Sequence, residues 1–346
     1  MKSGFWALGI ETSCDDTSAS VVDETLTVLS SVVGSQEIVH ARHGGVVPEL
    51  ASRKHSENII PVIDAALDEA GKSLGDVDLV AVTRGPGLIG SLLVGFMAAK
   101  GLAWGLGLPL VGVNHLAAHI WAAALDSGAR KLPTPSVCLI VSGGHTELLH
   151  YDGEGSEYLG GTRDDAAGEA YDKVARALGL GYPGGPIIDR IASSYRGKLL
   201  DLPRPMLQSG DFDFSFSGLK TAVAVASEGW ESLDGASIES LAASFQEAVV
   251  DVLVTKAMAA LEATGADNLI AAGGVAANSR LRSRLRDECA SRGARLFIPP
   301  LKYCTDNAAM VAAAGINRYL ERGADDRQID VDPGLSLRRE DGGINL

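Results

Sequence analysis

Residues 5–33 read FWALGIETSCDDTSASVVDETLTVLSSVV, in which three short apolar runs are separated by polar turns. Runs of this length that are rich in β-branched residues predict strands, here at Phe5–Ile10, Ala19–Val22 and Leu26–Val33. Further along the chain, helical and strand patterns alternate. They predict a helix at Arg53–Ala70, a strand at Val77–Thr83, a helix from Ser91, a strand at Leu110–Val113 and a further helix. This alternation predicts an α/β fold with a largely parallel sheet.

A second round of the same pattern begins near Pro135. The predicted strand Ser136–Ser142 runs into Gly143-Gly144 and then into a strand at Thr146–Tyr151, as the first strand runs into its own polar turn. A buried strand at Asn268–Ala272 and a helix at Thr305–Glu321 follow. The repetition predicts a duplicated α/β unit. The polar tail from Gly323 onward is expected to be peripheral.

Composition and charge exclude several classes of protein. The formal charge is −14 over 346 residues, so bulk electrostatics do not favour nucleic acid and RNA binding would need a local basic patch or a partner. The four cysteines show no metal-type or disulfide-type spacing, which is typical of a reduced, cytoplasmic protein. The most apolar stretch, Leu88–Leu125, is interrupted by Lys100 and Pro109, so no membrane span is expected.

The segment NHLAAH places His115 and His119 four residues apart, directly after a predicted strand. On a helix this spacing puts both imidazoles on one face, where they make half of a divalent-metal site. Asp306, at a predicted helix start, supplies a hard oxygen that would complete a set suited to Fe²⁺, Zn²⁺ or Mn²⁺. The alternative is an ordinary polar helix face, with Asp306 as a first-turn carboxylate favoured by the helix dipole.

Glycine-rich and polar turns occur at several strand ends, where they suit phosphate binding. They are ETSCDDT (11–17), GPGLIGSLLVG (85–95) and SGGHTE (142–147). Exposed backbone NH groups in such turns bind anionic oxygen. Segment 85–95 lacks the Lys of a P-loop. Two later segments suit a nucleoside: Asp189 in the loop GYPGGPIID (181–189) can accept hydrogen bonds from a ribose, and GGVAANSRLR (273–282) offers a platform for a purine and its ribose. The alternatives are ordinary turns, close helix packing, solvated acidic residues at Asp172 and Asp189, and a helix cap at Asn278 or Ser279.

Taken together, these motifs resemble one family, the tRNA N(6)-adenosine threonylcarbamoyltransferases, formerly described as O-sialoglycoprotein endopeptidases. The resemblance spans nearly the whole chain in the family's order. Besides the segments quoted above it includes GGVVPELASRKH (44–55), DDAAGEAYDKVARALGLGYPGGP (164–186), FSFSGLKTAV (214–223) and the segment around Asp306. The combination is specific, although no single piece is.

The resemblance implies an actin-like, sugar-kinase-type (ASKHA) fold with two α/β lobes around a nucleotide cleft. We expect residues 1–114 with 323–346 to form the N-lobe and residues 115–322 the C-lobe. The implied reaction transfers threonylcarbamoyl from threonylcarbamoyl-AMP to N6 of the adenosine 3′ of the anticodon, in tRNAs that read codons beginning with A. ATP or ADP is also expected to fit the cleft.

The resemblance also implies roles for individual residues. His115, His119 and Asp306 would bind one metal ion, with Fe²⁺ favoured and Zn²⁺ as the alternative. The implied substrate-binding residues are Val141, Ser142, Gly143, Gly144, His145, Asp172, Gly185, Asp189 and Asn278. The sequence does not identify the base that deprotonates the amine, for which Glu11 and Asp15 are weak candidates.

Three other functions compete with this one. A metalloprotease of the zincin type needs a Glu where this chain has Leu116, which disfavours it. A small-molecule kinase or ATPase of the same fold would have no use for the histidine pair. A non-catalytic scaffold is disfavoured by the intact glycine-rich loops and the three ligands. Besides tRNA, the implied partners are a shorter paralogue of the same fold and a small P-loop ATPase.

Overall fold

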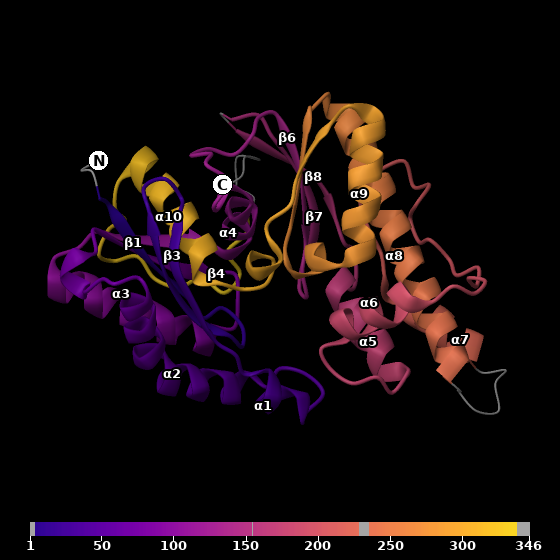
Figure 1. Ribbon diagram of the computed structural model, residues 1–346, viewed down its shortest axis with the longest axis horizontal. Helices are drawn as coiled ribbons and strands as arrows, with labels where there is room; N and C mark the ends of the chain where they lie inside the picture. The colour runs from indigo at the N-terminus through magenta and orange to yellow at the C-terminus, as the bar shows by residue number, and fades with distance from the viewer. Residues whose placement is uncertain (1–3, 154, 228–234, 338–346) are drawn as a thin grey trace. The chain divides into compact units, whose positions relative to one another are not determined.

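The computed structural model describes residues 4–153, 155–227 and 235–337, which fold into two compact units (Figure 1). The first unit comprises Met1–Leu132 and Pro299–Leu346, and the second comprises Pro133–Ile298. This division differs from the predicted boundaries at residues 114 and 322. The reason is that the histidine helix and the last helix pack on the first sheet. Residues 338–346 of the predicted N-lobe lie outside the described part of the chain.

The first unit contains a five-stranded sheet of order β3-β2-β1-β4-β5. Its strands are β1 (Trp6–Glu11), β2 (Thr17–Asp23), β3 (Val28–Gly34), β4 (Leu79–Gly85) and β5 (Leu110–Asn114). The first three strands pair antiparallel, whereas β1, β4 and β5 are parallel. The sheet is therefore mixed rather than largely parallel, because short turns can join only antiparallel neighbours.

Helices cover both faces of this sheet. On one face α2 (Pro48–Glu69) and α3 (Ile89–Leu106) bury Ile59, Ile63 and Phe96 against Leu8 and Ile10 of β1. On the other face lie α4 (His115–Trp121) and α10 (Ala308–Arg322). The short elements of the unit are α1 (Glu37–Ala41), η1 (Leu74–Asp76), η2 (Ala122–Ala124) and η4 (Leu301–Tyr303). Helix α2 begins five residues before the predicted start at Arg53, because Pro48 occupies its first turn, where proline is favoured.

Helix α3 is long and apolar enough to cross a membrane by length and composition alone, which is weak support for a membrane span. Its residues Leu92, Phe96 and Ala99 are fully buried in the core of the first unit. The opposite side of the same helix exposes Met97 and Trp104, which are 55% and 51% accessible.

The second unit repeats the topology of the first. Its sheet has the order β10-β9-β6-β7-β8, with β6, β7 and β8 antiparallel and β6, β9 and β10 parallel. The predicted duplication is therefore confirmed. The strands are β6 (Ser136–Val141), β7 (Thr146–Tyr151), β8 (Ser156–Gly161), β9 (Asn268–Ala272) and β10 (Arg295–Phe297). The helices are α5 (Ala167–Ala177), α6 (Gly184–Ser194), α7 (Ser217–Ser227), α8 (Gly235–Thr264), η3 (Gly274–Ala277) and α9 (Ser279–Arg292).

The segment after α10 belongs to the first unit, as expected for the N-lobe, but it is bonded to the sheet rather than peripheral. Residue Asp325 pairs with edge strand β5, since its backbone NH donates to Leu110 O and its carboxylate accepts from Gly112 N. Farther on, the carbonyl of Leu335 accepts from the Asn114 side chain at 3.2 Å. The segment also lies so close to Gly85 that a Cβ there would overlap the Asp332 carbonyl oxygen. The tail thus covers a strand edge that would otherwise present unpaired backbone groups.

Candidate metal centre and loops of the second unit

The two histidines are presented by the short helix α4, which begins directly after β5. Asn114 caps this helix, since its side-chain oxygen accepts from the backbone NH groups of Leu116 and Ala117. His115 and His119 lie one turn apart, with ring centroids separated by 4.7 Å. They are only 9% and 1% exposed. The two imidazoles thus lie side by side on one face of the helix, as predicted, and both are buried.

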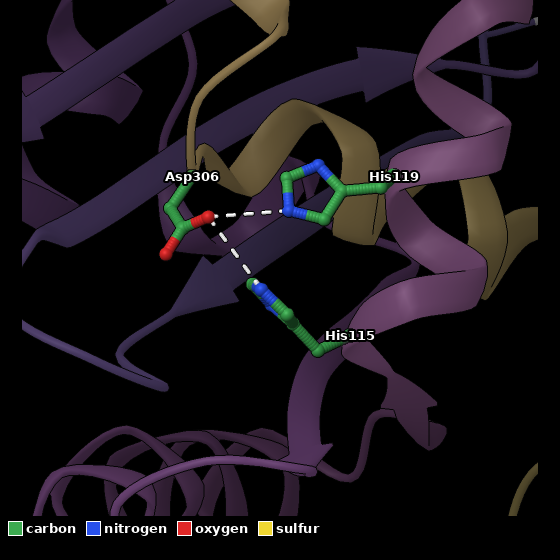
Figure 2. Close-up of side chains that lie close together, drawn as sticks. All are labelled: His115, His119 and Asp306. Atoms are coloured by element: carbon green, nitrogen blue, oxygen red, sulfur yellow. Dashed lines mark ion pairs between the residues drawn. The ribbon is translucent and has the colours of Figure 1, made fainter. Parts of the chain in front are cut away.

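Asp306 reaches the same point from the other end of the chain (Figure 2). It lies between η4 and α10, and the next residue, Asn307, caps α10 by accepting from Met310 N. The Oδ1 atom of Asp306 lies 3.2 Å from His119 Nε2 and 3.5 Å from His115 Nε2. The ligand atoms of these three residues all lie within 4.8 Å of one another.

The chemistry of this cluster fits a divalent metal ion. His119 is buried, yet among the described residues neither of its ring nitrogens has a hydrogen-bond partner, and its Nε2 atom is in ion-pair contact with Asp306. Buried polar atoms without partners are uncommon and costly, so an unmatched imidazole indicates a missing ligand. Two imidazole nitrogens and one carboxylate oxygen form a donor set that suits Fe²⁺ or Zn²⁺ and leaves coordination positions open.

The charges of the cluster also favour a cation. Burial by itself lowers the pKa of His115, but the carboxylates of Asp306 and Glu11 outweigh it and raise that pKa to about 9. Burial opposes ionisation of Asp306 as well, yet the two histidines hold the pKa of that carboxyl below its ordinary value. A divalent ion would take the place of the proton that His115 otherwise carries.

The two candidate bases differ in position. Glu11 is fully buried at the end of β1, where its Oε2 atom lies 3.0 Å from His115 Nδ1. Asp15 lies in the turn between β1 and β2, where its charge helps to raise the pKa of Asp16 to about 6, after the larger effect of burial. Of the two, only Glu11 is in hydrogen-bond contact with a predicted metal ligand.

In the second unit, the loop after β6 exposes backbone. The Ser142 backbone NH donates to His145 O, and the His145 backbone NH donates to the Ser142 hydroxyl, which closes a tight turn after Val141. Gly143 and Gly144 are exposed at its tip, and a Cβ on either would meet open space. Exposed NH groups on such a turn suit an anionic oxygen.

The remaining predicted substrate residues join helices of the second unit. Asp172 on α5 accepts from Gly184 N at 2.8 Å, beside Gly185. Asp189 on α6 accepts from the Ser279 backbone NH and hydroxyl at 3.0 and 2.8 Å. Asn278 caps α9 and donates to Gln246, so the helix-cap interpretation of Asn278 is confirmed.

A cavity of about 440 Å³ adjoins Ser279. It is lined by Arg280 of the segment 273–282 and by side chains outside the predicted motifs, including Ser193, Tyr195, Arg196 and Gln246. Its volume lies in the range of small-molecule sites. The only local signal in the sequence was SSYRG (193–197), an aromatic and an arginine directly after a helix, which is not specific to a ligand.

Comparisons with known proteins bear on what this arrangement does. A family model described as TsaD, tRNA N6-adenosine threonylcarbamoyltransferase, matches residues 27–313. A protein of that name from Geobacillus thermodenitrificans is 52% identical over 344 residues, covering 97% of this chain and 98% of that protein. Another from Symbiobacterium thermophilum is 53% identical over 333 residues, covering 95% and 96%.

Solved structures with low sequence identity share the fold. HypF from T. kodakarensis superposes with a TM-score of 0.59 at 14% identity, covering 92% of this chain and 48% of that chain. The activator of the 2-hydroxyisocaproyl-CoA dehydratase from Clostridium difficile gives a TM-score of 0.54 at 14% identity, covering 92% and 96%. The predicted actin-like, sugar-kinase-type fold is confirmed.

Proposed function

Since this chain belongs to the tRNA N6-adenosine threonylcarbamoyltransferase family, we propose that His115, His119 and Asp306 hold the metal ion that its reaction requires. The family's enzymes are acyltransferases that move a threonylcarbamoyl group from threonylcarbamoyl-AMP to N6 of an adenosine in tRNA. The observation that carries the proposal is the convergence of three ligand atoms on one buried point. The donor set favours Fe²⁺, with Zn²⁺ as the alternative.

The acyl donor is a mixed anhydride and is already activated. The enzyme must therefore hold its carbonyl near the incoming amine and stabilise the oxyanion and the departing phosphate. A metal ion at the three ligands would act as a Lewis acid toward such oxygens. We assign the anionic part of the donor to the turn Val141–His145, because Gly143 and Gly144 are exposed residues and a Cβ on either would meet open space.

The nucleoside part of the donor belongs, in this proposal, with Asp172, Gly185, Asp189 and Asn278. The same group would hold ATP or ADP. Its support is that Asp189 and Asn278 adjoin Ser279, which lines a cavity of about 440 Å³, although none of the four assigned residues lines that cavity itself. In the described structure the Asp189 carboxylate is occupied by Ser279. A ribose hydroxyl would have to share or replace that partner.

We propose three macromolecular partners. They are tRNA, a shorter paralogue of the same fold and a small P-loop ATPase, all acting in the cytoplasm. The net charge of −14 supports weak tRNA binding by the isolated chain, because phosphate contacts dominate such affinity. Exposed apolar side chains along α3, namely Ile89, Leu93, Met97 and Trp104, support a protein partner on that helix.

The metalloprotease alternative finds no support in the structure. Leu116 occupies the position where a zincin has its general base, and it is only 2% exposed. Glu11 does contact His115, but it lies on the Nδ1 side, away from the point where the three ligand atoms converge. Incubation with a glycoprotein substrate is expected to give no cleavage.

Reconstitution with unmodified tRNA and threonylcarbamoyl-AMP tests the proposal. His115→Ala and Asp306→Asn are each expected to lose bound metal, measured by elemental analysis, and to lose transfer activity. His43→Ala, which changes an exposed histidine of the same unit, is the matched control and should keep both. Wild-type metal content and transfer rate in His115→Ala would refute the assignment.

A further inference from the structure

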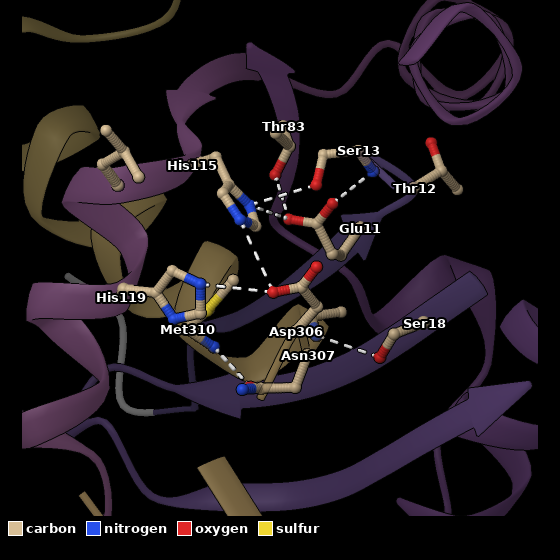
Figure 3. A network of polar contacts seen from close by, with 12 residues as sticks. Glu11, Thr12, Ser13, Ser18, Thr83, His115, His119, Asp306, Asn307 and Met310 are labelled. Atoms are coloured by element: carbon tan, nitrogen blue, oxygen red, sulfur yellow. Dashed lines mark hydrogen bonds and ion pairs between the residues drawn. The ribbon is translucent and has the colours of Figure 1, made fainter. Parts of the chain in front are cut away.

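Glu11 is a fully buried carboxylate that lies beside the His115 ring, next to Ser13 and Thr83 (Figure 3). Its Oε2 atom is 3.0 Å from His115 Nδ1, while the other nitrogen of that ring, Nε2, faces Asp306 at 3.5 Å. The two nitrogens of His115 therefore have different partners. Nδ1 contacts the Glu11 carboxylate and, at 3.2 Å, the Ser13 hydroxyl, which can accept from it as well, whereas Nε2 lies among the ligand atoms.

We propose that Glu11 is a positioning residue that fixes the tautomer of His115, an inference that rests on the proposed metal centre. An ionised carboxylate can only accept hydrogen bonds, so Nδ1 must carry the proton. In a neutral imidazole this leaves the lone pair on Nε2, which is the atom that faces Asp306 and His119. Such carboxylate–histidine pairs orient a ligand ring and increase its basicity toward a metal ion.

The contacts of Glu11 explain why it stays in place. The Ser13 backbone NH donates to Oε1 at 2.5 Å, and the Thr83 hydroxyl donates to Oε2 at 2.6 Å. The carboxylate is thus held between the end of β1, the strand β4 and the helix α4. Thr83 is 1% exposed, so this arrangement is shielded from water. A rigid acceptor on the Nδ1 side keeps the ring from rotating or changing its tautomer.

The same contacts argue against Glu11 as the base that deprotonates the substrate amine. Both of its oxygens already accept hydrogen bonds from groups of the protein, and its side chain is inaccessible. A general base must be within hydrogen-bond reach of the proton that it removes. Glu11 instead reaches His115, and its influence on the reaction would be exerted through that ring.

Glu11→Gln is the sharpest test, because it keeps the shape of the side chain. If the amide oxygen accepts from Ser13, the amide NH₂ faces His115 Nδ1 and favours the tautomer with the proton on Nε2. We expect the affinity for Zn²⁺, measured on the full chain by competition with a chromogenic chelator in the absence of tRNA, to fall about 10- to 100-fold. In ¹⁵N spectra of the Zn²⁺-loaded wild type, the His115 signals should show a protonated Nδ1.

Glu24→Gln serves as a control for Glu11→Gln, and Thr83→Val perturbs the same contact in a second way. Glu24→Gln makes the same change at a carboxylate of this unit that accepts from the backbone of Gly4 and Phe5, and it should leave Zn²⁺ affinity unchanged. Thr83→Val removes one donor to Glu11 while retaining the carboxylate, and it should give a smaller loss of affinity. If Glu11→Gln does not fold, Thr83→Val tests the same contact.

The outcomes separate this inference from the proposed function. A wild-type chain that binds no metal would overturn the metal centre itself. A wild type that binds Zn²⁺ and a Glu11→Gln variant that binds it equally well, with the proton still on Nδ1, would overturn only the role of Glu11. Loss of transfer with unchanged metal affinity and tautomer would make Glu11 a base and would likewise overturn the inference.

Discussion

Substitution by alanine is expected to destabilise the protein at Gly184 but not at the adjacent Gly185, both of which lie at the start of α6. A Cβ added to Gly184 would lie 2.6 Å from Tyr171 O, 2.7 Å from Ala175 Cβ and 2.9 Å from Asp172 Cα. Two of these atoms belong to the backbone of α5, so the overlap is relieved only by moving the two helices apart. A Cβ on Gly185 would meet nothing within 4 Å. Gly184 is therefore packed tightly against α5, whereas Gly185, the next residue, has room for a side chain.

Gly184→Ala is expected to destabilise the protein by about 1–3 kcal/mol, the usual cost of overpacking. The melting temperature, measured by calorimetry, should fall by about 2–4 °C per kcal/mol for a domain of this size. Gly185→Ala should leave it unchanged or slightly raised, because alanine restricts the unfolded chain. Its effect should appear in the KM for threonylcarbamoyl-AMP, since Gly185 is assigned to the donor site. Equal destabilisation by both variants would refute this reasoning.

Further predictions concern the first unit and the partners. Burial and Asp15 raise the pKa of Asp16 to about 6 in the folded protein. The contribution of Asp16 to stability should therefore be fully present below about pH 4 and be lost as the pH rises through about 6, and Asp16→Asn should remove this part of the pH dependence in urea unfolding. Asn114→Ala should weaken Zn²⁺ binding more than Asn114→Asp does. The Asp side chain still caps α4 and loses only the hydrogen bond to Leu335, whereas Ala loses both contacts. Equal losses of Zn²⁺ affinity in the two variants would contradict this. Filter binding should show weak tRNA affinity for the isolated chain, and tight, salt-resistant binding would argue against a need for partners.

Much of the candidate site follows from local sequence. The spacing of His115 and His119 predicts their shared helix face, and the strand–turn–strand pattern around Gly143 predicts the duplicated unit. These features depend on residues within a few positions of one another. Asp306 was a candidate third ligand from the type of its side chain and from the family resemblance, because no local pattern joins residues so far apart in sequence.

Other features could not be predicted because they depend on tertiary contacts. The buried hydrogen-bond contact between His115 and Glu11 is one such feature. In the sequence, Glu11 is only one of several acidic residues in a polar segment. The tail after Gly323 is polar in composition, yet its backbone pairs with the edge of β5. Backbone hydrogen bonds of this kind depend little on side-chain type, so a hydropathy pattern does not reveal them.

The order of the two units along the chain has a consequence for synthesis. The second unit is one continuous stretch, Pro133–Ile298, whereas the first is assembled from both ends of the chain. During synthesis the second unit can therefore finish folding while the first unit still lacks α10 and Asp306. Both histidines leave the ribosome long before their carboxylate partner does. A complete set of ligands exists only after translation has passed residue 306, so prematurely terminated products would be unable to capture the ion with all three groups.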